Sequence, residues 1–278
     1  MSLSGLAQIN VELSSRCNKR NLCAFCGHQN SVINTGLTYG DMDFTILSNI
    51  RQALDVGVVV QFHRDGDPLV YPRLRDALDL FTGFTTNLVT HGEILADKAE
   101  SIIGRCTTVT VSCFKGDPDH AIQFEAVTRF LHIKGSRAPM VLIKIVGDYP
   151  DHPYGDLGVQ VIHRLIHQPT GNTKYAHRTP TVPEHGICLD ALHHPSVDWQ
   201  GNVYLCNRLD PTGSTKMGDL RTSTLDEIWN GHQRQYWIEA HKAGRRDQAA
   251  SLCKDCTFWG VPSGYEPSTK AELIQVGA

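Results

Sequence analysis

Most of the nine cysteines in this 278-residue chain lie in two groups whose spacing is typical of metal ligands. The first group, within the segment CNKRNLCAFC, comprises Cys17, Cys23 and Cys26. The second group lies near the other end and comprises Cys188, Cys206, Cys253 and Cys256. Closely spaced cysteines in a chain without a secretory signal bind metal more often than they form disulfides. The remaining two match no ligand spacing, and we expect them to be buried beside a strand: Cys106 and Cys113.

The amino-terminal group offers three thiolates, which is one fewer than a closed four-ligand site needs. A cubane iron–sulfur cluster held by three cysteines keeps one iron free for a small ligand. A zinc ion completed by a nearby group such as His28 is the alternative interpretation. The carboxyl-terminal group offers four thiolates, which suit either zinc or an iron–sulfur cluster, and spacing alone does not separate the two.

Composition excludes several classes of function. The formal net charge of −3 gives no electrostatic footprint for nucleic acid or an anionic membrane. No apolar run approaches the eighteen or so residues of a membrane span. The start, MSLSGLAQINVEL, lacks the basic region and apolar core of a secretory signal. We therefore expect a cytoplasmic protein without nucleic-acid or membrane partners, and 41% hydrophobic residues suffice for a full core.

Short strand-like runs alternate with helical patterns through the first half of the chain, which predicts βαβ units and a parallel sheet. Strands are expected at residues 8–13, 58–62, 85–90, 107–112, 140–146 and 160–166. Helices are expected after Asp43, at 71–81 with Pro72 in the first turn, at 94–103 and at 121–131. The segment 147–158 reads as a loop. Six units predict a partial (β/α)6 barrel resembling a TIM barrel.

The alternation of strand-like and helical patterns ends at residues 169–183, which are rich in Pro, Thr, Gly and Asn. This change predicts a domain boundary between residues 1–183 and 184–278. Beyond it, residues 197–199 and 203–205 flank a Gly-containing turn and predict a β-hairpin. Thr224 and Glu227 have the spacing of a capping box at the start of a helix that runs through Trp229 and onward.

The amino-terminal half resembles the radical S-adenosylmethionine (SAM) superfamily. Its usual cysteine loop is C-x3-C-x2-C with an aromatic residue before the last cysteine. Here the spacing is C-x5-C-x2-C, and Phe25 is the aromatic. The second strand is followed by Gly66, Asp67 and Pro68, where the family has the Gly-Gly-Glu-Pro motif that receives the SAM amino group. His91 follows the third strand and Ser112 ends the fourth, where the family contacts SAM.

The carboxyl-terminal part resembles the twitch form of the SPASM extension of these enzymes. The resemblance implies one auxiliary [4Fe-4S] cluster held by Cys188, Cys206, Cys253 and Cys256, besides the SAM-binding [4Fe-4S] cluster. The cysteine spacing is similar to that of the aminocyclitol dehydrogenase of butirosin biosynthesis. The helix that follows the hairpin could also be a plain amphipathic helix packed against it, and this would hold whichever metal is bound.

The resemblance implies that SAM is cleaved to a 5′-deoxyadenosyl radical, which abstracts hydrogen from a substrate. We expect oxidation of a small hydroxylated metabolite, with the auxiliary cluster as electron acceptor and a ferredoxin or flavodoxin as electron donor. A peptide-modifying maturase is the alternative, disfavoured by a first strand that begins near residue 8. A non-catalytic zinc-binding module is the alternative from another class. Residues on or near late strands that are candidates to face the substrate are Lys144, His163, Arg164 and His167.

Overall fold

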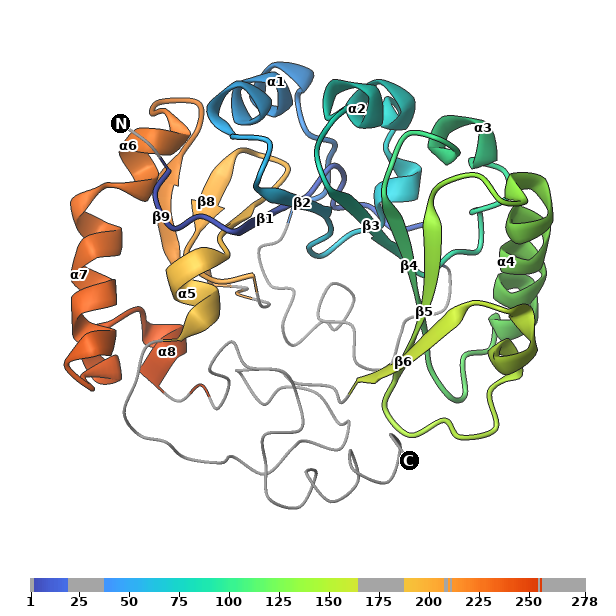
Figure 1. Ribbon diagram of the computed structural model, residues 1–278. Helices are drawn as coiled ribbons and strands as arrows, with labels where there is room; N and C mark the ends of the chain where they lie inside the picture. Colours follow the sequence, from blue (N-terminus) through green and yellow to red (C-terminus); the bar gives the residue numbers. More distant parts are fainter. Residues whose placement is uncertain are drawn as a thin grey trace.

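A curved sheet forms the centre of this computed structural model (Figure 1). The structure describes residues 3–19, 38–164, 188–207, 210, 212–254 and 256. Within these residues, the strand order is β6-β5-β4-β3-β2-β1-β7-β8-β9. The first six strands are consecutive neighbours, as in a barrel that grows by one βα unit at a time.

The six strands of the amino-terminal part pair in parallel and confirm the predicted partial (β/α)6 barrel. They are rich in β-branched residues, which favour extended backbone. Their bounds are β1 (Gln8–Val11), β2 (Val59–Phe62), β3 (Thr86–Thr90), β4 (Thr108–Cys113), β5 (Met140–Val146) and β6 (Gln160–Arg164).

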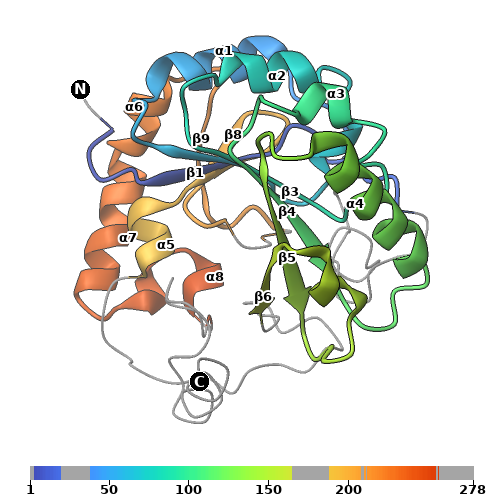
Figure 2. The same cartoon turned by 45° about the vertical axis from the view of Figure 1, so that its right-hand side comes forward.

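Four helices cover the outer face of these strands (Figures 1 and 2). They are α1 (Phe44–Ala53), α2 (Leu74–Leu80), α3 (Ala99–Ile102) and α4 (His120–Lys134). Asp43 begins α1 as predicted, because its side chain accepts a hydrogen bond from the Thr45 amide. The apolar side of α1 is fully buried at Leu47 and Ile50. The predicted burial of Cys106 and Cys113 is also confirmed, and burial raises the pKa of each thiol to about 12.

Two predicted helices are shorter than the sequence pattern indicated. The run 71–81 becomes helical only at Leu74, so Pro72 precedes the helix instead of lying in its first turn. The reason is a separate 3-10 turn, η1 (Pro68–Val70), which Asp67 caps. The run 94–103 is helical only over α3, because residues from Gly92 onward form tighter turns.

No α-helix joins β5 to β6 among the described residues, in agreement with the loop predicted at 147–158. A 3-10 segment, η2 (Pro153–Leu157), takes its place. Tyr154 is buried here, and its ring packs edge-on against Phe124 while its hydroxyl donates to Gln123. Leu157 and Val159 of the same connection also pack against the core.

The carboxyl-terminal part extends the same sheet. After α5 (Leu189–His193), β7 (Ser196–Val197) pairs in parallel with β1, and β8 (Asn202–Tyr204) and β9 (Lys216–Asp219) add antiparallel. The predicted hairpin is thus confirmed. The capping box of Thr224 and Glu227 is also present, and it begins α6 (Leu225–Trp229). The helix does not continue, since Gly231 starts a second one, α7 (His232–Lys242), before η3 (Arg246–Gln248) and α8 (Ser251–Lys254).

The two faces of the parallel sheet differ in chemistry. The outward residues are apolar and fully buried against the helices: Val60, Phe62, Leu88, Val109, Val111, Ile143 and Ile145. The intervening residues on the inner face include Gln61, Asn87 and Thr110, and the first two are partly exposed. Side chains alternate between the faces of a strand, so this pattern gives the barrel an apolar outside and a polar inside.

Gly66 lets the ends of β1 and β2 approach each other closely. A Cβ atom at this position would lie 2.2 Å from the Ser14 carbonyl oxygen and 2.6 Å from the Ser15 Cα. We expect Gly66→Ala to push the Ser14–Ser15 backbone away and to lower the free energy of unfolding by about 2–3 kcal/mol or more. Urea denaturation followed by circular dichroism measures the change.

The matched control is Gly57→Ala, because a Cβ there meets no atom within 4 Å. We expect this variant to unfold within about 0.5 kcal/mol of the parent chain. Equal stability of the two variants would contradict the close approach at Gly66.

Candidate functional site

The amino-terminal cysteine loop begins at the carboxyl end of β1. Cys17 is partly exposed there, and Cys23, Phe25, Cys26 and His28 lie outside the described residues. The two flanks of the loop are joined, since the Ser15 amide donates to the Gly40 carbonyl at 3.0 Å and Ser14 pairs with Asp41. The Asp67 amide donates to the Arg16 carbonyl at 2.8 Å. The loop base is therefore fixed beside the turn that follows β2.

Asp67 holds the ends of β2 and β3 together. Its buried carboxylate accepts from the Leu69 amide at 2.9 Å, the Thr90 hydroxyl at 2.7 Å and the His91 amide at 3.1 Å. Asp67 therefore positions the turn through its side chain. The cofactor-binding role of Gly66, Asp67 and Pro68 stays a prediction. In that role the backbone of the turn would contact the cofactor, because the Asp67 carboxylate is already hydrogen-bonded within the protein.

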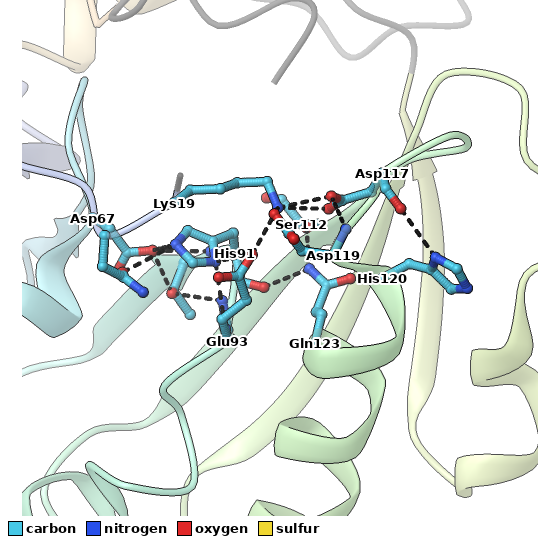
Figure 3. A network of polar contacts seen from close by, with 12 residues as sticks. Lys19, Asp67, His91, Glu93, Ser112, Asp117, Asp119, His120 and Gln123 are labelled. Carbon is cyan, nitrogen blue, oxygen red and sulfur yellow. Dashed lines mark hydrogen bonds and ion pairs between the residues drawn. The ribbon is translucent and has the colours of Figure 1, made fainter. Parts of the chain in front are cut away.

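His91 lies between the loop and the turn. Its Nε2 atom is 3.2 Å from Asn18 Oδ1 and 3.4 Å from Asp67 Oδ2. Its carbonyl accepts a hydrogen bond from the Gln123 side chain, which also donates to the Ser112 carbonyl at 2.9 Å. One buried glutamine of α4 thus joins the ends of β3 and β4, where both predicted SAM contacts lie (Figure 3).

Lys19, two residues after Cys17, connects the loop to β3 and β4 (Figure 3). Its Nζ atom is 2.8 Å from Asp117 Oδ1, 2.7 Å from Glu93 Oε1 and 3.3 Å from Asp119 Oδ2. The Lys19 side chain is 2% exposed and that of Asp117 is 0% exposed. Burial alone lowers the pKa of Lys19, but its hydrogen bonds to Asp117 and Glu93 outweigh burial and raise that pKa. The ammonium is therefore charged, and three carboxylates hold it.

A small acid-rich cavity of about 190 Å³ adjoins the loop base on the hairpin side. Glu12 follows β1 and accepts from the Asp65 and Gly66 amides at 3.0 and 3.3 Å and from the Trp199 amide at 3.1 Å. Burial, followed by repulsion from Asp65, raises the pKa of Glu12 to about 7. The guanidinium of Arg64, which also lines the cavity, pairs with Asp65 and lies over the Tyr204 ring.

A row of neutral polar side chains crosses the inner face of the sheet. Thr110 donates to Asn87 at 3.0 Å, and the side-chain amides of Asn87 and Gln8 donate to Gln61 at 3.4 and 3.1 Å. The row ends on His194, whose Nε2 atom is 2.7 Å from both Gln8 Nε2 and Asn10 Oδ1. We call these six residues the inner polar row.

The candidates on late strands differ in position. Lys144 alternates with buried residues of β5 and is partly exposed, on the inner side of the sheet. His163 and Arg164 are exposed at the end of β6. His167 lies outside the described residues. Their contact with substrate stays a prediction.

The carboxyl-terminal cysteines lie around a second apolar cluster, which contains Cys188 and Cys253. Cys188 directly precedes α5, and Cys206 follows β8. Burial, followed by repulsion from the Cys188 and Cys256 thiolates, raises the pKa of Cys253 to about 12. Three of the four thiols are thus electrostatically coupled, and a bound cationic metal relieves such repulsion. This chemistry fits the predicted cluster.

No group of three His, Cys, Asp or Glu side chains in the described part of the chain is arranged to hold a metal ion as it stands. The ligand sets therefore stay predictions. The same residues include no helix long and apolar enough to cross a membrane.

Comparison with known proteins decides the fold. None of the curated proteins matches the sequence significantly. Residues 188–257 match the SPASM family, an iron–sulfur cluster-binding domain. The structure of BtrN in complex with AdoMet and 2-DOIA superposes with a TM-score of 0.64 at 19% identity, covering 92% of this chain and 94% of that one. The chain has the radical SAM fold with a SPASM-type domain.

Two further structures share this radical SAM fold. Streptococcus suis SuiB bound to precursor peptide SuiA matches with a TM-score of 0.63 at 13% identity, covering 91% of this chain and 71% of that one. Native anSMEcpe with bound AdoMet matches with a TM-score of 0.60 at 12% identity, covering 90% of this chain and 88% of that one. The predicted resemblance and fold class are confirmed, and the matched segment is an iron–sulfur domain. The boundary at residue 183 stays a prediction, because 165–187 lie outside the described residues.

Several residues of the site were not predicted from sequence. Lys19 lies inside the cysteine loop, yet its partners are 74 to 100 residues away in the chain. Gln8, Asn10 and Glu12 do carry a signal, since polar residues at every second position of a strand indicate a polar barrel interior. His194 carries no such signal.

The ion pairs of Lys19 provide a test of how the loop is held. Lys19→Met removes the ammonium and leaves the fully buried Asp117 carboxylate without its cation. We expect the free energy of unfolding to fall by about 3–5 kcal/mol. Urea denaturation of the metal-free chain measures the loss.

The matched control is Lys115→Met, because the Lys115–Asp151 pair is 3.6 Å long and both side chains are more than half exposed. We expect it to cost less than about 1 kcal/mol. In the double variant Lys19→Met with Asp117→Asn, part of the lost stability should return. A Lys19→Met chain as stable as the control would show that the loop is held by other contacts.

Proposed function

We propose that this chain is a radical SAM enzyme that uses a second, auxiliary iron–sulfur cluster. The observation that carries the proposal is the meeting of Cys17, the Asp67 turn and His91 at the carboxyl ends of β1, β2 and β3. Active sites of barrel folds lie at this edge. The matched SPASM segment and the three structural neighbours support the same proposal.

In this proposal, the three amino-terminal cysteines hold a SAM-binding [4Fe-4S] cluster and the four carboxyl-terminal cysteines hold the auxiliary one. When bound, SAM with its cluster supplies a 5′-deoxyadenosyl radical that takes a hydrogen atom from carbon, and the auxiliary cluster supplies an acceptor for one further electron. The protein orients these groups. The backbone after β2 would receive the amino group of SAM, and His91 and Ser112 would line the remainder of its site.

The inner polar row favours a small hydroxylated metabolite as substrate. Amide and hydroxyl side chains bind neutral hydroxyl groups through both donors and acceptors. Gln8, Gln61 and Asn87 are partly exposed on the concave side, so their hydrogen-bonding capacity faces the barrel interior. Oxidation of an alcohol to a ketone removes one carbon-bound hydrogen atom, one electron and one hydroxyl proton.

Modification of a peptide is the second candidate function. The observation that favours it is the match to SuiB bound to a precursor peptide, over 91% of this chain. The match to BtrN in complex with AdoMet and 2-DOIA, over 92% of this chain, favours the small-molecule substrate instead. The two candidates share the radical step and differ in the molecule that donates hydrogen.

Iron content and SAM cleavage test the class of enzyme. We expect anaerobically reconstituted protein to be brown with about eight iron atoms per chain, and to form 5′-deoxyadenosine from SAM and dithionite. Cys17→Ala should lose about half of the iron and all SAM cleavage. Cys188→Ala should lose about half of the iron and keep SAM cleavage, because its cysteine belongs to the auxiliary set.

The matched control is Cys106→Ala, since Cys106 is buried in the main core away from both sets. This variant should keep its full iron content. Colourless protein that contains zinc and no iron would overturn the proposal in favour of a zinc-binding module.

Deuterium transfer distinguishes the two substrate classes. The producing organism is grown in deuterated water, and its extract is divided into a small-metabolite fraction and a peptide fraction. Each fraction is incubated with unlabelled SAM and the reconstituted enzyme. We expect deuterium in 5′-deoxyadenosine with the small-metabolite fraction and none with the peptide fraction. Mass spectrometry of 5′-deoxyadenosine reads out the donor, and enrichment with peptides alone would favour the maturase.

A further inference from the structure

His241 is a fully buried histidine of α7, close to the carboxyl-terminal cysteines. Its residue exposure is 0%. Trp237 and Ile238 precede it by one helical turn and therefore share its side of the helix. Both of those residues pack in the apolar cluster that contains Cys188 and Cys253. The helix thus directs His241 toward the region of the predicted auxiliary cluster.

Neither ring nitrogen of His241 has a hydrogen-bond partner among the described residues. Leaving a buried polar atom unpaired costs about 1–3 kcal/mol, and native proteins pair nearly all such atoms. A valine or leucine would fill this position without that cost. The ring is therefore suited to a group other than the residues that the structure describes.

Arg246 interacts both with His241 and with the carboxyl-terminal cysteines. Its guanidinium donates to the Cys256 carbonyl at 3.0 Å, and its charge favours the thiolate of Cys253. The same charge acts on His241, where burial first and Arg246 second lower the pKa of the imidazole to about 4. A neutral imidazole carries one N–H donor and one acceptor. His241, Arg246 and the Cys253–Cys256 pair thus form one neighbourhood of α7, η3 and α8.

We propose that the N–H group of His241 donates a hydrogen bond to a sulfur of the auxiliary cluster or its thiolate ligands and so raises the reduction potential of that cluster. Hydrogen bonds to cluster sulfurs stabilise the more negative, reduced state. A raised potential makes the cluster a better acceptor for an electron from the substrate. This inference rests on the proposed function, since it assumes that the auxiliary cluster assembles. His241 is a positioning residue in this role, and not a ligand.

A redox titration of the auxiliary cluster tests the proposal. The Cys17→Ala chain is used as background, so that only the auxiliary cluster gives an electron paramagnetic resonance signal. In that background, His241→Phe should change the ratio of oxidised to reduced cluster at a fixed potential at least tenfold toward oxidised, which is about 59 mV for one electron. His241→Asn retains an N–H donor and should recover part of the shift. His232→Phe, on the exposed part of α7, should leave the ratio unchanged.

A measurement without a substitution at His241 keeps the proposal testable if the variants fail to fold. In the Cys17→Ala chain labelled with 15N-histidine, pulsed electron paramagnetic resonance should detect a weak nitrogen coupling and an exchangeable proton near the reduced cluster. An unchanged ratio in folded His241→Phe, or the absence of both couplings, would overturn the proposal. Loss of auxiliary iron in His241→Phe would also overturn it, because it would make His241 a ligand. If no auxiliary cluster assembles with His241 in place, the proposed function itself fails.

Discussion

The parallel pairing of β7 with β1 determines where the two cysteine groups lie relative to each other. Cys17 follows the carboxyl end of β1, whereas Cys188 lies before the amino end of β7. Since the strands run in the same direction, these two cysteines belong to opposite edges of one sheet. Cys206 joins Cys188 at its edge, because β8 runs antiparallel and the Ser196 hydroxyl donates to the Cys206 carbonyl at 2.8 Å. The pairing of β7 with β1 therefore separates the starts of the two predicted ligand sets.

The inner polar row occupies the stretch between those edges. Its members come from β4, β3, β2 and β1 in turn, and His194 adds the connection to the SPASM-type segment. Under the proposed function, a substrate held by this row would lie between the edge that carries Cys17 and the edge that carries Cys188 and Cys206. The apolar outer face takes no part in this chemistry, and its burial under α1–α4 keeps the strands in register. The two faces of the sheet differ in this way because successive side chains of a strand point to opposite faces.

Sequence predicted the elements whose signals are local. The β-branched runs gave all six parallel strands, Asp43 gave the start of α1, and Thr224 with Glu227 gave the start of α6. The helix boundaries near Pro72 and Ile94 were wrong, because Asp67 caps a separate 3-10 turn and residues from Gly92 onward form tighter turns. The spacing of apolar residues does not distinguish such turns from an α-helix. The pairing of β7 with β1 was likewise invisible, since residues 10 and 196 meet only in the folded sheet.

The candidate site divides in the same way. Cysteine spacing predicts both ligand sets, because residue type and order are visible in the sequence, and these sets stay predictions. The residues that hold those sets in place escaped prediction. Lys19 and Gln123 look like ordinary surface residues of a loop and a helix in the sequence, and only the fold shows that both are buried. Buried polar residues of this kind are recognised from their hydrogen-bond and ion-pair partners, and those partners are distant in the chain.

The gap between Cys17 and Cys23 begins with two residues that contact the barrel. The family's usual spacing places three residues there, and this chain has five, beginning with Asn18 and Lys19. Asn18 lies 3.2 Å from the His91 ring, and Lys19 binds Glu93, Asp117 and Asp119. Both residues thus turn toward the ends of β3 and β4 and are used to hold the loop. The first two residues of the gap therefore support the base of the loop as well as separating Cys17 from Cys23.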